Sequence, residues 1–296
     1  MTMKHTSKQT YAALVSVFLL WGSLYVVSKY ALNVLPAFVV IFLRSLIASA
    51  TLLLYLRIRK LARPVAKEDR RYFLLAGVGG YFLAVGLQTL GTKFASPSMA
   101  SLLNSLNPLI IFIPSYFLLG EKITPRKLLG IAVALTGVYV LLGGVKGQSE
   151  LAGVLCSLGS VACWSTVSTF NKRLTRKYDS LQITAYGVTI ATVFNLFPAA
   201  VEWSRQPAAL TLPAVLAILY MGVLCTGVAH FLWNWCLARM EASTCFAFYP
   251  LQPITSALLG ILFLRESITL RFVLGSVLTL LGIVCGVRED KKTAAS

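Results

Sequence analysis

Aromatic and polar side chains recur at helical spacing inside long stretches of this sequence that are otherwise apolar. In the first stretch Trp21, Tyr25 and Ser28 stand at positions i, i+4 and i+7, which share one face of an α-helix. Aromatic walls with a few convergent amide or hydroxyl groups are typical of a pocket for a small organic solute. The alternative is hydrogen bonding between helices, but for the stripes as a set we favour a pocket. The candidate substrate-binding residues are Trp21, Tyr25, Tyr81, Gln88, Asn104, Asn107, Trp164, Ser168, His230, Trp233, Asn234, Tyr249 and Gln252.

A second set consists of charged residues and prolines within or at the ends of the same stretches. Charged groups inside a membrane are costly and usually mark a solute pathway or a pairing with another group. The candidates for gating or hinge roles are Lys29, Arg44, Pro108, Glu121, Lys172, Pro253 and Glu266.

Arg44 lies eight residues past Pro36, which places it about 12 Å along a helix that begins there. No Asp or Glu occurs in its own stretch, and an unpaired buried guanidinium is unfavourable. Arg44 could reach a solute carboxylate, which would select amino acids or other organic acids. Alternatively, it binds carbonyls at a helix end or pairs with Glu266, and this structural pairing is the interpretation we favour.

Four of these residues lie where helical stretches end. Lys29 and Lys172 either guard the two mouths of a pathway or extend their amines to the membrane surface, and we favour the second interpretation. Glu121 and Glu266 either pair with basic residues to hold a gate closed or form simple surface ion pairs.

Pro108 and Pro253 fall in the middle of two apolar stretches. A proline inside a helix removes one backbone hydrogen bond and bends the helix. Because the proline recurs in both halves of the chain, we expect a hinge rather than a static kink.

Enzyme chemistry is not expected. His230 is the one histidine inside an apolar stretch. It is a possible site of proton coupling, but a hydrogen-bonded structural role is the interpretation we favour. The six cysteines have neither metal-ligand spacing nor a base beside them, so we expect no catalytic site, no metal and no cofactor.

The stretches that carry these residues have the composition of membrane helices. Apolar residues make up 57% of the chain and charged residues 12%, about half the average for soluble proteins. A span needs about 20 apolar residues, and lipid offers no partner to backbone groups, so spans must be helical. We therefore expect an all-α integral membrane protein with ten transmembrane helices. The uncharged runs, of which the second and third form one helix interrupted by Arg44, are Tyr11–Ser28, Ala31–Leu43, Ser45–Leu56, Tyr72–Thr92, Phe94–Gly120, Leu128–Val145, Leu151–Asn171, Ser180–Val201, Gln206–Ala238, Ala242–Leu264 and Phe272–Val287.

The chain contains the same unit twice. Residues 98–143 read again at 243–288, where Pro253 matches Pro108. Ten helices in two copies give five per copy, and an odd number inverts the second copy in the membrane. Inverted repeats are typical of secondary transporters, which bind their substrate near the midplane between the repeats.

The positive charge of the chain fits this topology. With the N-terminus in the cytoplasm, most of the 27 Lys and Arg residues fall on the cytoplasmic side, so both termini are expected there. The net charge of +17 then reflects topology and contact with anionic lipid headgroups. Because the basic residues are scattered over short loops, we expect the lipid bilayer and a small-molecule substrate as partners, and no nucleic acid.

Several of these motifs occur together in one known family. They extend over about residues 11–288 and are Trp21-Gly22, Arg44, Asn107-Pro108, Gly120-Glu121, Gly130 and Gly137, and in the second half Trp164, Pro253, Glu266, Gly275 and Gly282. On these residues the chain resembles the drug/metabolite transporter superfamily and, within it, the ten-helix EamA family. The sequence departs from a perfect repeat at Arg265, which replaces a glycine, and at Arg44, which has no second-half counterpart. The resemblance implies a cytoplasmic head (1–10), a first repeat (11–145), a second repeat (151–287) and a cytoplasmic tail (288–296).

The resemblance also implies transport of small organic solutes, often export of amino acids or related metabolites, through a cavity between helices 1, 3, 4, 6, 8 and 9. We expect alternating access in the cytoplasmic membrane. A multidrug, cation or sugar carrier is the alternative, although the scarcity of acids within the spans argues against cation pumping. An integral-membrane enzyme or a channel fits the pattern less well. Glycines of the fifth and tenth helices serve either packing within the bundle or a homodimer contact.

Overall fold

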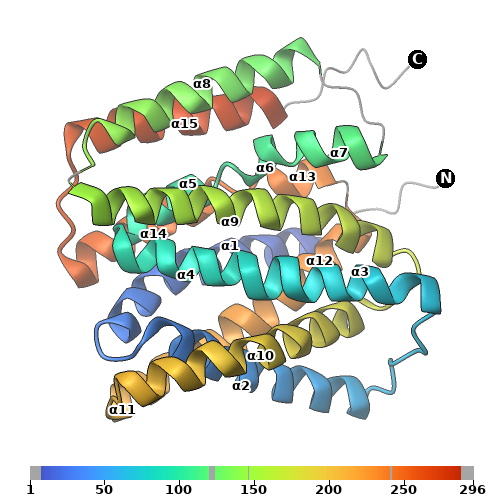
Figure 1. The fold of residues 1–296 in the computed structure, drawn as a ribbon. Coiled ribbons are helices and arrows are strands. Elements are labelled where there is room, and N and C mark those ends of the chain that lie inside the picture. The colour runs from blue at the N-terminus through green and yellow to red at the C-terminus, as the bar shows by residue number, and fades with distance from the viewer. Residues whose placement is uncertain (1–7, 120–123, 146, 241, 288–296) are drawn as a thin grey trace.

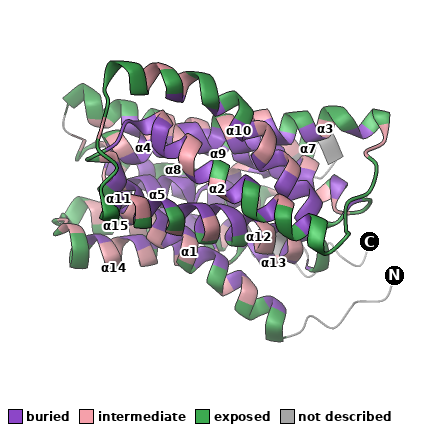
Figure 2. Ribbon diagram, turned by 90° about the horizontal axis from the view of Figure 1, so that it is seen from below, coloured by how far each residue is buried: buried purple, intermediate pink, exposed green. Residues whose placement is uncertain are grey.

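The computed structural model describes residues 8–119, 124–145, 147–240 and 242–287, and all regular structure in these ranges is helical (Figure 1). Buried residues lie toward the middle of the bundle and exposed ones on its outside (Figure 2). The elements are α1 (Lys8–Leu32), α2 (Ala37–Ile58), η1 (Lys67–Asp69), α3 (Arg70–Leu75), η2 (Ala76–Ala84), α4 (Val85–Phe94), α5 (Pro97–Asn104), α6 (Asn107–Ile110), α7 (Phe112–Leu119), α8 (Pro125–Leu142), α9 (Gly147–Leu174), α10 (Ser180–Arg205), α11 (Leu212–Leu219), η3 (Tyr220–Val228), α12 (Ala229–Arg239), α13 (Ala242–Phe246), α14 (Leu251–Leu264) and α15 (Leu270–Val287).

These elements form ten membrane spans. Eight continuous helical segments of the described chain are long and apolar enough to cross a membrane, and Leu270–Gly286 is a shorter apolar helix. The interrupted helix over residues 97–119 supplies the remaining span. The predicted all-α membrane fold with two inverted five-helix repeats is confirmed. In chain order, spans 1 to 10 are α1, α2, α3–η2–α4, α5–α6–α7, α8, α9, α10, α11–η3–α12, α13–α14 and α15.

Short polar caps set where several spans begin. The side-chain oxygens of Ser96, Thr124 and Thr211 accept hydrogen bonds from backbone N–H groups in the first turns of α5, α8 and α11. Each of these helices also has a proline in its first turn, where the missing N–H needs no intrahelical partner.

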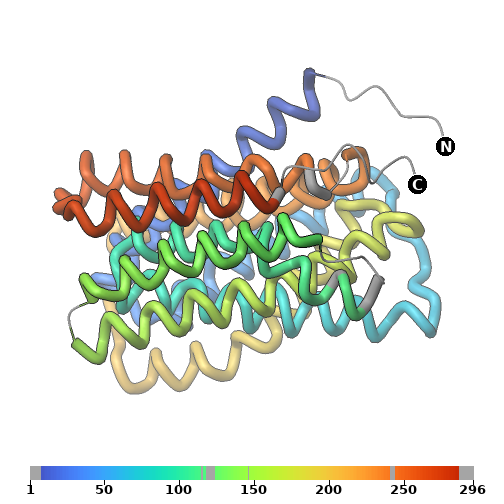
Figure 3. Tube along the Cα trace, turned by 90° about the horizontal axis from the view of Figure 1, so that it is seen from above, coloured from blue at the N-terminus to red at the C-terminus, as the bar shows by residue number. Residues whose placement is uncertain are grey.

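Spans 5 and 10 form a pair at one edge of the bundle, where α8 and α15 lie side by side (Figures 1 and 3). A Cβ atom placed on Gly130 would come within 2.6 Å of the Gly286 Cα, and one on Gly282 within 2.5 Å of the Ala134 backbone nitrogen. These glycines therefore serve close helix packing within one chain. They give no support to a homodimer, which stays a prediction.

Spans 4 and 9 are both broken. Two turn residues, 105–106, separate α5 from α6, and four, 247–250, separate α13 from α14. Pro108 and Pro253 lie in the first turns that follow these breaks. The prolines therefore do not lie inside continuous helices, as the sequence suggested, and their role as hinges stays a prediction. The helix ends before the proline, which begins the next segment.

Spans 3 and 8 share a different distortion. Each contains a nine-residue π-helix, η2 in the first repeat and η3 in the second. The two start at Ala76 and Tyr220, which correspond closely under the offset of the repeat. Short π-helical stretches inside α-helices are often found at functional sites.

Candidate functional site

A small cavity lies between the two repeats. Its walls come from spans 1, 3, 4, 6, 8 and 9, the six helices that carry the polar and aromatic stripes. The lining residues are Trp21, Leu24, Ala84, Val85, Gln88, Asn104, Asn107, Ser160, Trp164, His230, Tyr249 and Gln252.

Eight of the thirteen candidate binding residues line this cavity. The other five are buried but do not line it: Tyr25, Tyr81, Ser168, Trp233 and Asn234. Sequence reasoning missed four lining residues, which are Leu24, Ala84, Val85 and Ser160.

Aromatic rings form much of the wall. The rings of Trp21 and Trp164 meet edge to face, with centroids 6.2 Å apart. Their positions match under the internal repeat, so each repeat contributes one. Trp233 and Tyr249 pack edge to face with centroids 5.7 Å apart, and Trp233 lies 5.6 Å from Trp21. Edge-to-face contacts of this kind stabilise the aromatic group beyond the effect of its buried area.

His230 joins this aromatic group. Its ring lies 5.2 Å from that of Trp21 and 5.3 Å from that of Trp164. Its Nδ1 is 3.2 Å from the Cys225 carbonyl oxygen and 3.1 Å from that of Thr226, both in η3. Because a carbonyl only accepts, Nδ1 carries the hydrogen, and in the neutral ring Nε2 is left as an acceptor.

The break in span 4 supplies polar groups at the cavity. The Asn107 Nδ2 donates to the Asn104 carbonyl oxygen at 2.7 Å. This bond satisfies a backbone carbonyl that the break leaves without its usual helical partner. The hydroxyl of Ser165 in α9 donates to the Asn107 Oδ1 at 2.9 Å. Span 6 of the second repeat therefore packs against the broken helix of the first.

In the other half of the chain, the equivalent contact is a close approach of α1 to α14 at Gly22, which has no side chain. Gly22 matches Ser165 in the repeat, and a Cβ atom there would come within 2.7 Å of the Gln252 carbonyl oxygen. It would also come within 2.6 Å of the Thr255 Cβ. Span 1 therefore packs against the broken span 9, and the two repeats are linked through both breaks.

Tyr25 connects three spans beside the cavity. Its hydroxyl accepts hydrogen bonds from the Gln88 Nε2 at 2.7 Å and from the Gln252 Nε2 at 3.0 Å. Both glutamines line the cavity. These residues therefore form hydrogen bonds between helices, and the two glutamines also line the pocket.

Arg44 is 2% exposed and lies deep in the bundle. Its Nη2 donates to the Thr89 hydroxyl at 3.4 Å, a long contact, and its buried Nε has no hydrogen-bond partner. The favoured expectation of pairing with Glu266 or with helix-end carbonyls was wrong. The Glu266 carboxylate instead accepts from the Ser98 hydroxyl, at the end of the bundle where α1 ends.

Lys29 binds backbone carbonyls at the end of a neighbouring helix. Its half-buried amine donates to the carbonyl oxygens of Thr92, Lys93 and Ala95 at 3.2, 2.8 and 3.0 Å. It therefore caps the end of α4. Its roles at a pathway mouth or at the membrane surface stay predictions. Lys172 is half-buried near the end of α9. Glu121 lies outside the described residues.

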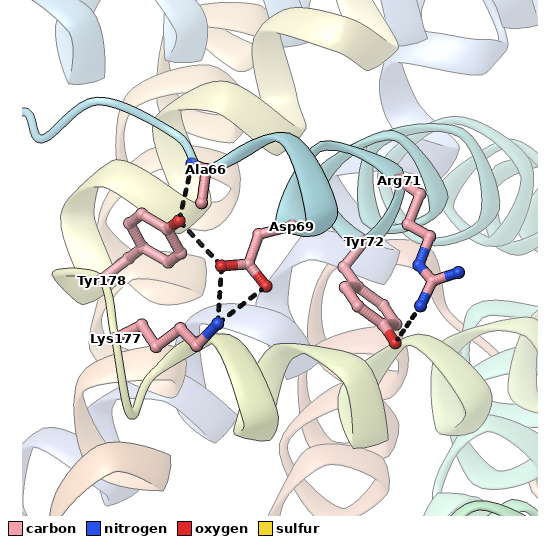
Figure 4. Close-up of polar contacts among 6 residues, drawn as sticks. All are labelled: Ala66, Asp69, Arg71, Tyr72, Lys177 and Tyr178. Atoms are coloured by element: carbon pink, nitrogen blue, oxygen red, sulfur yellow. Dashed lines mark hydrogen bonds and ion pairs between the residues drawn. The ribbon is translucent and has the colours of Figure 1, made fainter.

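A contact that sequence reasoning missed lies at the end of the bundle where α1 begins (Figure 4). The Lys177 amine lies 2.9 Å from the Asp69 Oδ2, and the Tyr178 hydroxyl donates to the same oxygen at 2.9 Å. The Ala66 backbone N–H donates to the Tyr178 hydroxyl at 3.1 Å. The loop between spans 2 and 3 is thereby tied to the loop between spans 6 and 7. We call the group Asp69, Lys177 and Tyr178 the loop latch.

A second pair of bonds lies beside the loop latch. The Gln182 amide donates to the Arg63 carbonyl oxygen at 2.7 Å and accepts from its N–H at 3.1 Å. At the opposite end, the Glu202 Oε2 accepts from the Phe38 N–H at 2.6 Å. Polar contacts between the two repeats are therefore present at both ends of the bundle.

The cavity is too small for an organic solute. The space that the centre of a water molecule can occupy there is about 30 Å³. That is room for about two waters. Binding of a metabolite requires the walls to move apart.

Comparison with known proteins agrees with this arrangement. The model of the EamA-like transporter family matches the chain twice, over residues 9–143 and 151–287. The chain belongs to the EamA-like transporter family. Its relatives include the uncharacterized transporter YoaV of Bacillus subtilis (strain 168), 29% identical over 93% of this chain and 94% of the relative. The uncharacterized transporter YvbV of the same organism is 28% identical over 98% of this chain and 95% of the relative.

An archaeal relative and a solved structure extend the comparison. An uncharacterized transporter of Archaeoglobus fulgidus is 29% identical over 91% of this chain and 95% of the relative. A crystal structure of a protein at 21% identity aligns with a TM-score of 0.69 and covers 94% of this chain and 96% of that chain. The structural likeness supports the fold of this EamA-like transporter.

Proposed function

We propose that this EamA-like transporter is a secondary carrier that moves amino acids or related small metabolites outward across the cytoplasmic membrane by alternating access. The observation that carries the proposal is the central cavity, which is shared by both repeats and lined by aromatic and amide groups beside two broken helices. Broken helices at a repeat interface are where secondary transporters bind their substrates.

The small volume of the cavity supports alternating access. Polar contacts join the repeats at both ends of the bundle, and the cavity has room for only about two waters. A solute therefore enters only when one end parts. Because the repeats are inverted, a state open at one end would resemble a state open at the other, with the roles of the two repeats interchanged.

The chemistry of the wall supports an amphipathic solute. Two tryptophans and Tyr249 offer apolar faces, while Gln88, His230 and the amides of span 4 offer hydrogen bonds. No Asp or Glu occurs among the lining residues of the described chain, which argues against a carrier for bare organic cations. Nor does this set hold a nucleophile with an adjacent base, so we propose no catalytic activity.

A thermal-shift screen of the purified protein in detergent tests the function. A ligand that binds only the folded state raises Tm as its concentration exceeds Kd. We expect neutral and aromatic amino acids to raise the Tm of the wild type and of Trp203→Ala, whose exposed ring does not line the cavity. The same solutes are expected to leave Trp164→Ala unchanged. A shift only with sugars or organic cations would sink the amino-acid assignment.

A further inference from the structure

Arg44 is a charged side chain that the bundle buries and does not neutralise. Its single hydrogen bond in the described chain is the 3.4 Å contact to Thr89. The Thr89 hydroxyl already donates to the Val85 carbonyl oxygen at 2.8 Å, so it can only accept from Arg44. No carboxylate of the described residues forms an ion pair with Arg44. A guanidinium left in this state destabilises the fold, so its presence in a span points to a function.

A second unused donor lies near Arg44. The Tyr25 hydroxyl accepts from Gln88 and Gln252, and neither bond uses its own hydrogen. Tyr25 bonds to Gln88 of α4, and Arg44 bonds to Thr89, the next residue of the same helix. Both side chains are buried, at 1% and 2% exposure. The Arg44 Nε and the Tyr25 hydroxyl hydrogen are therefore two buried donors without acceptors next to α4.

This region adjoins the cavity. Thr89, which contacts Arg44, follows the lining residue Gln88 in α4. The Thr89 hydroxyl also bonds to the carbonyl oxygen of Val85, another lining residue. Because Gln88 lines the cavity and bonds to Tyr25, a shift of its side chain would expose the Tyr25 hydroxyl to the cavity. Since the cavity must enlarge for any solute to bind, this shift needs no additional motion.

We propose that Arg44, with the Tyr25 hydroxyl beside it, receives the single carboxylate of the transported solute. The proposal deepens the proposed function and rests on it. A guanidinium presents a planar fork of N–H groups that matches a carboxylate. One cation neutralises one negative charge, and Lys29 is already occupied by three carbonyls. The solute is thus a monocarboxylate, with its ammonium or apolar part against the rings of Trp21 and Trp164.

The first experiment compares carboxylates with their esters. Binding is followed by Tm shift, and exchange of labelled solute is followed in proteoliposomes. The probes are neutral amino acids and simple monocarboxylates, each with its methyl ester. We expect the wild type and Arg57→Gln, an exposed arginine on the same helix, to prefer the acids by at least about tenfold. Arg44→Gln is expected to lose this preference, and Arg44→Lys to retain part of it.

The second experiment separates recognition from a structural role. Arg44→Met keeps the length of the side chain and removes the unpaired charge. If Arg44 serves the solute, this variant melts at the same temperature as the wild type or higher, yet no longer distinguishes acids from esters. A lower Tm, or failure to fold, would assign Arg44 a structural role and overturn the proposal.

The outcomes separate the carboxylate assignment from the carrier function. Equal binding of acids and esters by the wild type would overturn the carboxylate assignment and leave the carrier function standing. A preference for acids that survives in Arg44→Gln would likewise overturn the assignment alone. If no solute of the panel shifts the Tm or exchanges, the proposed function and this inference both fail.

Discussion

At the scale of single residues, Tyr25 joins spans 1, 3 and 9 through one hydroxyl. Tyr25→Phe removes an acceptor from two glutamine amides. Hydrogen bonds between membrane helices contribute about 0.6 kcal/mol each, so we expect a loss of about 1 kcal/mol in unfolding free energy. Solute binding should also weaken, because the two glutamines line the cavity.

The control for this prediction is Tyr139→Phe, which alters a hydroxyl at a residue that is 76% exposed. It is expected to match the wild type in denaturant or thermal unfolding and in solute binding. Equal stability of Tyr25→Phe and Tyr139→Phe would contradict the role given to the network.

The sequence could predict much of the cavity because polar residues stand out in apolar helices. Ser160 was missed although it precedes Trp164 by four positions and therefore shares its helix face. Leu24, Ala84 and Val85 carry no such signal, since an apolar residue that faces a cavity looks like one that faces lipid. The sequence also could not predict that Arg44 forms no ion pair, because its partners depend on which spans lie next to each other.

At the scale of elements, the contact of α1 with α14 depends on the absence of a side chain at Gly22. Gly22→Ala places a Cβ 2.6 Å from that of Thr255 and 2.7 Å from a carbonyl oxygen. We expect a loss of about 1–3 kcal/mol in stability, the usual effect of overpacking. Solute exchange should fall as well, because the added methyl group would displace α14 next to the break in span 9.

Gly86→Ala is the matched control for this substitution. It lies on α4, and a Cβ atom there meets nothing within 4 Å. Thermal unfolding and exchange should be close to those of the wild type. If Gly22→Ala behaves like Gly86→Ala, the close approach of the two helices is not important for the fold or for transport.

The loop latch gives a pH dependence. The hydrogen bond with Asp69 raises the pKa of Lys177 above its ordinary value of 10.5. A group whose pKa is raised by folding stabilises the fold below its unfolded pKa and loses this effect as pH rises through the folded pKa. We therefore expect the stability difference between the wild type and Lys177→Met to disappear in strongly alkaline solution. It should be small throughout, because the Lys177 side chain is 51% exposed.

Thermal unfolding of both proteins from neutral to alkaline pH makes this measurement. Lys67→Met, an exposed lysine of the same loop, controls for the loss of one positive charge. A stability difference for Lys177→Met that grows with pH would contradict the assigned ion pair.

The sequence predicted the elements better than their distortions. Apolar runs located the spans, but the prolines suggested bends within helices where the chain breaks at 105–106 and 247–250. The π-helices η2 and η3 were not foreseen, since one extra residue per turn leaves no composition signal. Such features are fixed by packing between repeats, which a single stretch of sequence does not contain.

At the scale of the whole molecule, the proposed topology places the loop latch in the cytoplasm. Cysteines introduced at Lys67 and Gln206 lie in exposed loops at opposite ends of the bundle. In intact cells, with the six native cysteines replaced, a membrane-impermeant maleimide is expected to label Gln206→Cys. Lys67→Cys should react only after the membrane is opened. The reverse pattern would overturn the assignment of the termini to the cytoplasm.

The central claim is that the solute passes through the cavity shared by the two repeats. Counterflow in proteoliposomes, with the wild type, Trp164→Ala and Trp203→Ala compared at equal protein content, tests it most directly. We predict saturable uptake of a labelled amino acid by the wild type and Trp203→Ala, and its loss in Trp164→Ala. Uptake by Trp164→Ala equal to that of the wild type, or a flux that does not saturate, would contradict this claim.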